Sequence, residues 1–321
     1  MIATSNGLAV RRPADGPSNP AGSRVKGVRV AGAGGWYRAS VLRRRLYVTD
    51  AIVLSRVDFG EADRILTLLT PELGKIKAIA KGIRRPTSRI GGALEPLAEL
   101  RIQLAKGRTF DVVTQVTMQH TWLGLRDGLE VTATAWYCAE LAERSLEERH
   151  AALPVYLLLR RAYELLDAGM APARVARWFE MRLCDELGVR PEVDRCVECD
   201  RLLAPDDVVR WVPALGGALC ADHAGPSTMA AGLSTEALKV LKAYQRMDVE
   251  ALAGLRLPPA VEREVEERLG AFVRHVMERD TRSRRFLEEV KAGYGAVAAR
   301  SGTPAVSAGP APAPSPEGGS R

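Results

Sequence analysis

The sequence predicts an α+β protein in which a small β-barrel precedes a helical domain interrupted by a cysteine-containing module. Three observations lead to this fold class. Short runs of β-forming residues alternate with turn residues from Tyr47 to Met118, and apolar residues then recur at helical spacing from Gly124 to Gly188. Three cysteines and a histidine follow in two closely spaced pairs between residues 196 and 223. We therefore expect two ordered domains.

The ends of the chain differ in composition from this central part. Residues 1–45 are rich in Gly, Pro, Ser, Ala and Arg, and residues 292–321 form a Pro/Ala/Gly tail. Such segments cannot bury enough apolar surface to offset their ordering entropy, so both are expected to be disordered. A GTG start codon at Val41 would be read as Val from an upstream start, so we expect the extension to be partly an artefact of the assigned start.

The β-type region predicts five strands. VTDAIVLSRV, RILTLLT and KIKAIAK are separated by the turns DFGEAD and PELG, and a long polar loop then leads to ELRIQLA and FDVVTQVTM. In the fourth run Leu100, Ile102 and Leu104 alternate with polar residues, which is typical of a strand with one buried face. Five short strands with a long loop after the third predict an OB-fold barrel over residues 46–121.

The rest of the chain, residues 122–291, is expected to be a helical domain. Its larger apolar residues are predicted to form the core. They include Trp136, Tyr137, Leu141, Tyr156, Trp178 and Phe179. Ser234 and Thr235 are candidate caps for a helix in STEALKVLKAY.

The positive charge is concentrated in two places. The net charge is +7, yet residues 1–46 hold nine Lys or Arg against one acid, and residues 75–108 hold nine against two. A compact basic field on an otherwise acidic chain is expected of a protein that binds a polyanion, although a solvated Lys- and Arg-rich face has the same composition.

A row of lysines on the third predicted strand is the sharpest sign of such binding. Side chains alternate along a strand, so Lys75, Lys77 and Lys81 are expected on the face opposite Ile76 and Ala78. Arginines in the following loop extend the row, although lysines also protect exposed strand edges in proteins that bind nothing there. The candidate polyanion-binding residues are Lys75, Lys77, Lys81, Arg84, Arg85, Arg89, Arg101 and Arg108.

The segment CVECD raises a choice between redox chemistry and metal binding. Cys196 and Cys199 are followed by Cys220 and His223, so each pair is separated by two residues. A thioredoxin-type motif requires a strand-to-helix junction, which is not expected here. Four N and S donors instead predict a structural zinc ion, in a module at about residues 190–226, with no position left open for catalysis. Cys138 and Cys184 lie in helical apolar patterns and are expected to be inert core residues.

Several functional classes have no support in the sequence. There is no phosphate-binding GxxxxGK[ST] motif, and His120, His150 and His275 have no catalytic partner beside them, so we expect no enzyme. The sequence contains neither an apolar run of membrane-spanning length nor a secretory signal. We therefore expect no membrane association and a cytoplasmic location.

Four stretches carry a wider resemblance, namely DFGEADRILTLLT, KGIRRPTSR, ELGVRPEVDRCVECD and SRRFLEEV. In these stretches, and most strongly in the first two, the chain resembles the RecO family of bacterial DNA repair and recombination mediators. It differs at His223, where a four-cysteine member would have cysteine, and in the first 40 residues.

The resemblance implies a nucleoid-associated protein that binds single- and double-stranded DNA and anneals complementary strands. It also implies partnership with RecR and single-stranded-DNA-binding protein, and through them the loading of RecA. Between Tyr47 and His120 the Phe, Trp and Tyr residues are Tyr47, Phe59 and Phe110, so we expect phosphate contacts rather than a ladder of stacked bases. Two alternatives remain. One is a zinc-containing RNA-binding or ribosome-associated adaptor, and the other is a redox enzyme that uses Cys196 and Cys199.

Overall fold

In the computed structural model of the chain, residues 46–85, 94–204, 207–223 and 230–277 are described. The N-terminal extension, the C-terminal tail, Arg89 and the SRRFLEEV segment, whose structure or role was predicted from the sequence, lie outside these residues.

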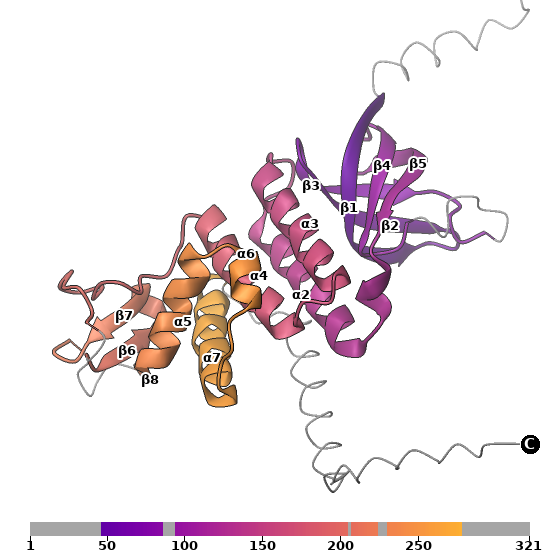
Figure 1. Cartoon of the computed structure of the whole chain (residues 1–321). Helices are drawn as coiled ribbons and strands as arrows, with labels where there is room; N and C mark the ends of the chain where they lie inside the picture. Colours follow the sequence, from indigo (N-terminus) through magenta and orange to yellow (C-terminus); the bar gives the residue numbers. More distant parts are fainter. Residues whose placement is uncertain (1–45, 86–93, 205–206, 224–229, 278–321) are drawn as a thin grey trace, which may run out of the picture. The chain divides into compact units, whose positions relative to one another are not determined.

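The first part of the described chain is a five-stranded sheet. Its strands close in the order β1-β2-β3-β5-β4, and β3 and β5 pair in parallel at two positions whereas the other neighbours are antiparallel. This OB-like arrangement confirms the five predicted strands. They are β1 (Leu46–Phe59), β2 (Asp63–Thr70), β3 (Gly74–Ala80), β4 (Ala98–Ala105) and β5 (Asp111–Thr121) (Figure 1).

Alternate side chains of each strand form a core inside this sheet. Leu66 and Leu68 of β2 meet Ile76 and Ala78 of β3, and all four are fully buried. Because successive residues of a strand point to opposite faces, the residues between them lie on the outer face. Full burial of each large aliphatic side chain contributes about 1.5–3 kcal/mol before ordering entropy is subtracted.

A β-bulge interrupts this alternation in β1. Val53 lies opposite Leu68, but Ser55 lies opposite Thr67, so Leu54 is an extra residue on its strand. Val53 faces the barrel core, whereas Leu54 packs into the helical core. Before the bulge the odd-numbered residues of β1 face the barrel core, and beyond it the even-numbered residues do.

The helical region begins with the short 3-10 helix η1 (Leu123–Arg126). Helices α2 (Leu129–Ser145), α3 (Leu153–Asp167) and α4 (Pro172–Glu186) follow. Pro172 starts α4, where its missing N–H is not needed, and Gly169 ends α3 with a φ of 81°. The predicted core residues here are buried, apart from Trp136, which stays partly exposed.

Part of the outer face of the barrel is covered by this helical region. Ile52 and Leu69 join the helical core rather than the barrel core. Glu99, also on the outer face, is buried and accepts hydrogen bonds from Tyr156 Oη at 2.5 Å and Arg160 Nε at 3.2 Å. Only the remaining outer surface is open to a ligand.

The cysteine-containing module includes a three-stranded sheet in the order β7-β6-β8. Its strands are β6 (Val209–Val212), β7 (Gly217–Cys220) and β8 (Ala231–Leu233), with η2 (Pro213–Leu215) between the first two. Trp211 is buried, and its indole N–H donates to the Arg268 carbonyl at 2.8 Å. A Cβ at Gly217 would lie 2.2 Å from the Glu192 carbonyl oxygen, so only glycine allows this close approach.

The described chain ends with α5 (Thr235–Arg246), α6 (Val249–Ala253) and α7 (Pro259–Val276). Ser234 caps α5, because its hydroxyl accepts from the Ala237 N–H at 3.1 Å, as predicted. Arg268 and Trp211 join α7 to the module. Among the helices in the described ranges, none has both the length and the apolar character that crossing a bilayer requires.

Candidate nucleic-acid interface and metal centre

The predicted lysine row lies on the outer face of β3. Ile76 and Ala78 point into the barrel core, so Lys75 and Lys77 point outward, and Lys81 follows directly after the strand. Lys77 and Lys81 are exposed, whereas Lys75 is half-buried.

Two of the three lysines contact the helical region. The Lys75 ammonium donates to the Glu143 carbonyl at the end of α2 at 2.6 Å, which commits this side chain to the packing of α2 on the barrel. Lys77 pairs with Glu148 at 2.8 Å, and both side chains are about half exposed, at 45% and 51%. An exposed pair of this kind is weak, so phosphate can replace the carboxylate.

The arginines after β3 lie beside the turn between β1 and β2. The Arg84 N–H donates to the Ala62 carbonyl at 3.0 Å, and its guanidinium lies 3.5 Å from the Asp58 carboxylate. Arg84 and Arg85 are both exposed. Lys77, Lys81, Arg84 and Arg85 are thus all exposed along β3 and the turn after it, with the Arg84 guanidinium beside Asp58 of β1.

The last two predicted residues, Arg101 and Arg108, lie outside β3 and the turn that follows it. Arg101 is exposed on β4, where it pairs with Asp50 at 3.0 Å, and β4 is not a neighbour of β3 in the sheet order. Arg108 is exposed in the connection between β4 and β5, and the first residue of β5, Asp111, pairs with Ala78 of β3. Only Arg108 therefore lies on the β3 side.

Arg149 was not predicted from the sequence, although it lies at the edge of β3. Its N–H donates to the Lys75 carbonyl at 2.9 Å, and its guanidinium donates to the buried carboxylate of Asp111 at the same distance. Burial alone would raise the pKa of Asp111, but hydrogen bonds from Tyr47, Gly107 and Arg149 hold it below its ordinary value. Since Arg149 comes from the α2–α3 connection, no pattern in the β-region could indicate it.

The four predicted metal ligands lie together. Their S and N atoms are all within 4.8 Å of one another in the described residues. The Cys199 and Cys220 sulfurs are 3.9 Å apart, and His223 Nδ1 lies 3.9 Å from the Cys196 sulfur and 3.2 Å from the Cys220 sulfur. A tetrahedral site with metal–sulfur bonds near 2.3 Å has ligand separations of about 3.8 Å. These four residues can hold one metal ion, and the donor set is consistent with zinc.

Two tight turns bring the ligands together. The Asp200 N–H donates to the Cys196 carbonyl at 2.9 Å, and the His223 N–H donates to the Cys220 carbonyl at 3.2 Å. Burial would raise the pKa of the Cys196 thiol, but backbone hydrogen bonds from Cys220, Cys199 and neighbouring residues lower it overall. The turns therefore favour the thiolate that a metal ion needs. Cys138 and Cys184 are fully buried elsewhere, and burial raises the pKa of both thiols.

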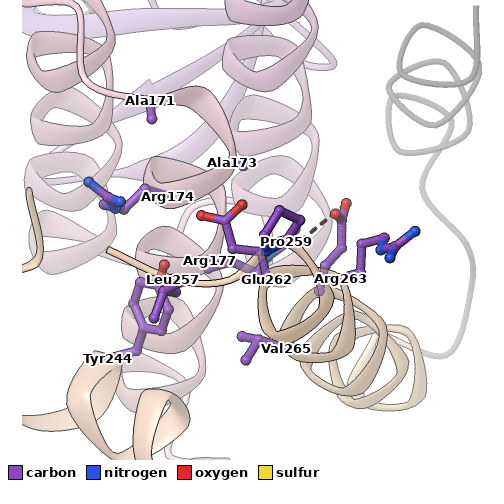
Figure 2. A pocket seen from close by; sticks show the side chains of 11 residues that line it. Ala171, Ala173, Arg174, Arg177, Tyr244, Leu257, Pro259, Glu262, Arg263 and Val265 are labelled. Carbon is purple, nitrogen blue, oxygen red and sulfur yellow. Dashed lines mark ion pairs between the residues drawn. The ribbon is translucent and has the colours of Figure 1, made fainter. Parts of the chain in front are cut away.

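A separate cavity of about 440 Å³ lies between α4 and α7. Figure 2 shows Arg174, Tyr244, Leu257 and Arg263 around it. The Arg174 guanidinium is committed to the Ala253 and Leu255 carbonyls at 2.7 and 2.6 Å. The buried guanidinium of Arg177 pairs with Glu180 and Glu266. The charges of these two arginines thus serve the fold.

Comparison with known families agrees with this architecture. Residues 44–122 match the family model for the recombination protein O N terminal, and residues 126–285 match the model for the recombination protein O C terminal. The chain belongs to the RecO family. The resemblance seen in the sequence is therefore confirmed, and membership makes this a DNA repair and recombination protein.

Curated RecO proteins show the same relation along most of the chain. The DNA repair protein RecO of Roseiflexus sp. (strain RS-1) is 38% identical over 250 residues, which cover 78% of this chain and 88% of the relative. The DNA repair proteins RecO of Anaeromyxobacter sp. (strain Fw109-5) and Symbiobacterium thermophilum are 36% and 34% identical, and in each case 98% of the relative is covered. The RecO similarity thus includes both the barrel and the helical region.

Proposed function

We propose that this RecO-family protein binds single- and double-stranded DNA through the outer face of β3 and anneals complementary strands. The observation that carries the proposal is that Lys77, Lys81, Arg84 and Arg85 are all exposed along β3 of an OB-like barrel and in the turn that follows it. Ala78, Ala80 and Ile83, which lie between them, belong to the barrel core, so the cations can be exposed without disturbing the fold.

Contacts to phosphate suit strand annealing. A protein that holds the backbone leaves most base edges free to pair with another strand. Neutralising phosphate charge on both strands also lowers the repulsion that slows their encounter. We propose a role of binding and not catalysis. Family membership supports the further proposal that the protein acts in the cytoplasm, on the nucleoid, with RecR and single-stranded-DNA-binding protein to load RecA.

The proposed zinc ion has a structural role. Cys196 and Cys220 are buried, and they belong to the same core as Trp211 and α7. A metal ion held by four protein donors has no open position for substrate, so it would tie the module together rather than react.

The test compares two variants of the full chain that lose the same charge. The first neutralises Lys77, Lys81, Arg84 and Arg85, and the control neutralises four exposed cations of the helical region and module. The control residues are Arg210, Lys239, Arg256 and Arg263.

The barrel variant should bind DNA more weakly at every sequence. The slope of the logarithm of its DNA association constant against the logarithm of the salt concentration should become shallower by about 0.7 per lost contact on single strands and about 0.9 on duplex. Annealing should fall with it, while the control stays near the parent. Equal losses in the two variants would place the DNA surface elsewhere, and stronger binding to RNA oligonucleotides than to DNA would favour the adaptor alternative.

A further inference from the structure

An exposed apolar patch lies on the same outer face as the lysine row. Val57 and Phe59 of β1 are 64% and 50% exposed. Val57 is paired with Ile65 of β2, and Ile65 is paired with Ile79 of β3, so these side chains adjoin across three strands. We call Val57, Phe59, Ile65 and Ile79 the hairpin patch, of which Val57 and Phe59 are exposed, Ile65 is partly buried and Ile79 is buried.

The bulge in β1 explains why these residues face outward. Before it, the odd-numbered residues Ala51 and Val53 belong to the barrel core. After it, Arg56 lies opposite the core residue Leu66, and Val57 lies opposite Ile65 on the outer side. Two apolar side chains that a regular strand would bury are thus presented to solvent.

Basic groups lie on both sides of the patch. Lys77 and Lys81 are each two residues from Ile79, on its face of the chain, and both are exposed. On the α2 side, a groove of about 540 Å³ between Val57 and Trp136 is lined by groups of both signs, with Arg56 and Arg144 as well as Glu140 and Glu143. The charge that favours an anionic chain beside the patch therefore comes from Lys77 and Lys81.

We propose that the hairpin patch contacts unpaired bases of single-stranded DNA, with the Phe59 ring as the stacking surface and Lys77 and Lys81 on the flanking phosphates. The inference rests on the proposed function and makes it more specific. An apolar surface flanked by cations fits a ligand that is itself a flat ring between phosphates. It has room for a few bases at most, so the rest of the strand stays free to anneal.

The patch gives the protein a strand preference. Bases of a duplex are paired and stacked inside it and cannot lie on Phe59, whereas the lysines reach phosphates of either form. Single strands therefore gain a contact that is independent of salt, and duplex does not.

The experiment uses the full chain with Phe59→Ala, Phe59→Tyr and the control Leu202→Ala. Leu202 is also an exposed aliphatic side chain, at 62%, but it lies in the cysteine-containing module. The ligands are a single-stranded oligonucleotide carrying 2-aminopurine and an unlabelled duplex of the same length, titrated at several salt concentrations.

Phe59→Ala should weaken single-strand binding by about 5-fold or more, with the parent's salt slope and an unchanged duplex affinity. The change in 2-aminopurine fluorescence on binding should be lost in Phe59→Ala and kept in Phe59→Tyr and Leu202→Ala. An unchanged single-strand affinity and fluorescence in Phe59→Ala would overturn the inference, and so would an equal loss on single strands and duplex.

The two proposals fail separately. If the variant that neutralises Lys77, Lys81, Arg84 and Arg85 loses DNA binding while Phe59→Ala behaves as the parent, the proposed DNA surface stands and the proposed base contact is wrong. If both bind as the parent does, both proposals are wrong.

Discussion

Replacing Glu148 by Gln should strengthen DNA binding. The Glu148 carboxylate lies 2.8 Å from the Lys77 ammonium, and that hydrogen bond holds the pKa of Glu148 below its ordinary value. At neutral pH the Glu148 carboxylate is therefore charged, and DNA must displace it before Lys77 can contact a phosphate. Glutamine keeps the size of the side chain but removes the competing charge.

The size of the gain follows from the exposure of the pair. Half-exposed ion pairs are worth about 0.2–1 kcal/mol, so their removal should raise the DNA association constant by about 1.4- to 5-fold at low salt. If Lys77 then makes a full phosphate contact, the log-log salt slope should steepen by up to about 0.7 on single strands.

The matched control is Glu147→Gln, which makes the same charge change one residue away. The Glu147 side chain is 84% exposed, and its carboxylate lies 3.5 Å from His150 Nδ1. Fluorescence anisotropy with a labelled oligonucleotide at several salt concentrations measures both variants. An equal gain in the two variants would show a general field effect, and no gain in Glu148→Gln would refute the reasoning that the pair competes with phosphate.

Two further predictions concern the fold. Cys196→Ser should abolish the binding of about one zinc per chain and destabilise the helical region. The control Cys184→Ser, at an equally buried thiol, should keep the metal. The metal content of both purified variants tests this, and a Cys196→Ser protein that still held the metal would exclude the site. Asp111→Asn should lower the free energy of unfolding in urea by about 1–3 kcal/mol at neutral pH, because it removes a buried carboxylate that accepts from Tyr47 and Arg149. Since the pKa of Asp111 is depressed in the folded protein, its contribution to the free energy of unfolding is complete above about pH 4 and is lost as the pH falls through the folded pKa. A stability difference between the parent and Asp111→Asn that did not shrink in acid would contradict the assignment.

Features that depend on neighbours in the sequence could be predicted, because strand alternation and ligand spacing are local. The outward face of Lys77 follows from the period of two in β3, and the metal cluster follows from two pairs of donors. The environment of Lys75 and Glu99 could not be predicted, because the groups that cover them come from helices many residues away.

Two other features also escaped the sequence patterns. The short strands of the module are set by pairing across turns, and three or four residues give too little periodicity to recognise. The bulge at Leu54 is defined only by the partner strand, so a regular alternation from Val53 would have placed Phe59 inside the barrel.

The bulge also makes the helical core, rather than the outer surface, sensitive to chain length. Deleting Leu54 would leave Ser55 opposite Thr67 and Val57 opposite Ile65, so β1 would regain a regular alternation with Val57 and Phe59 still facing outward. The deletion would instead remove a buried side chain from the helical core. Shortening the strand by this one residue should therefore cost stability while the apolar surface of β1 stays in place.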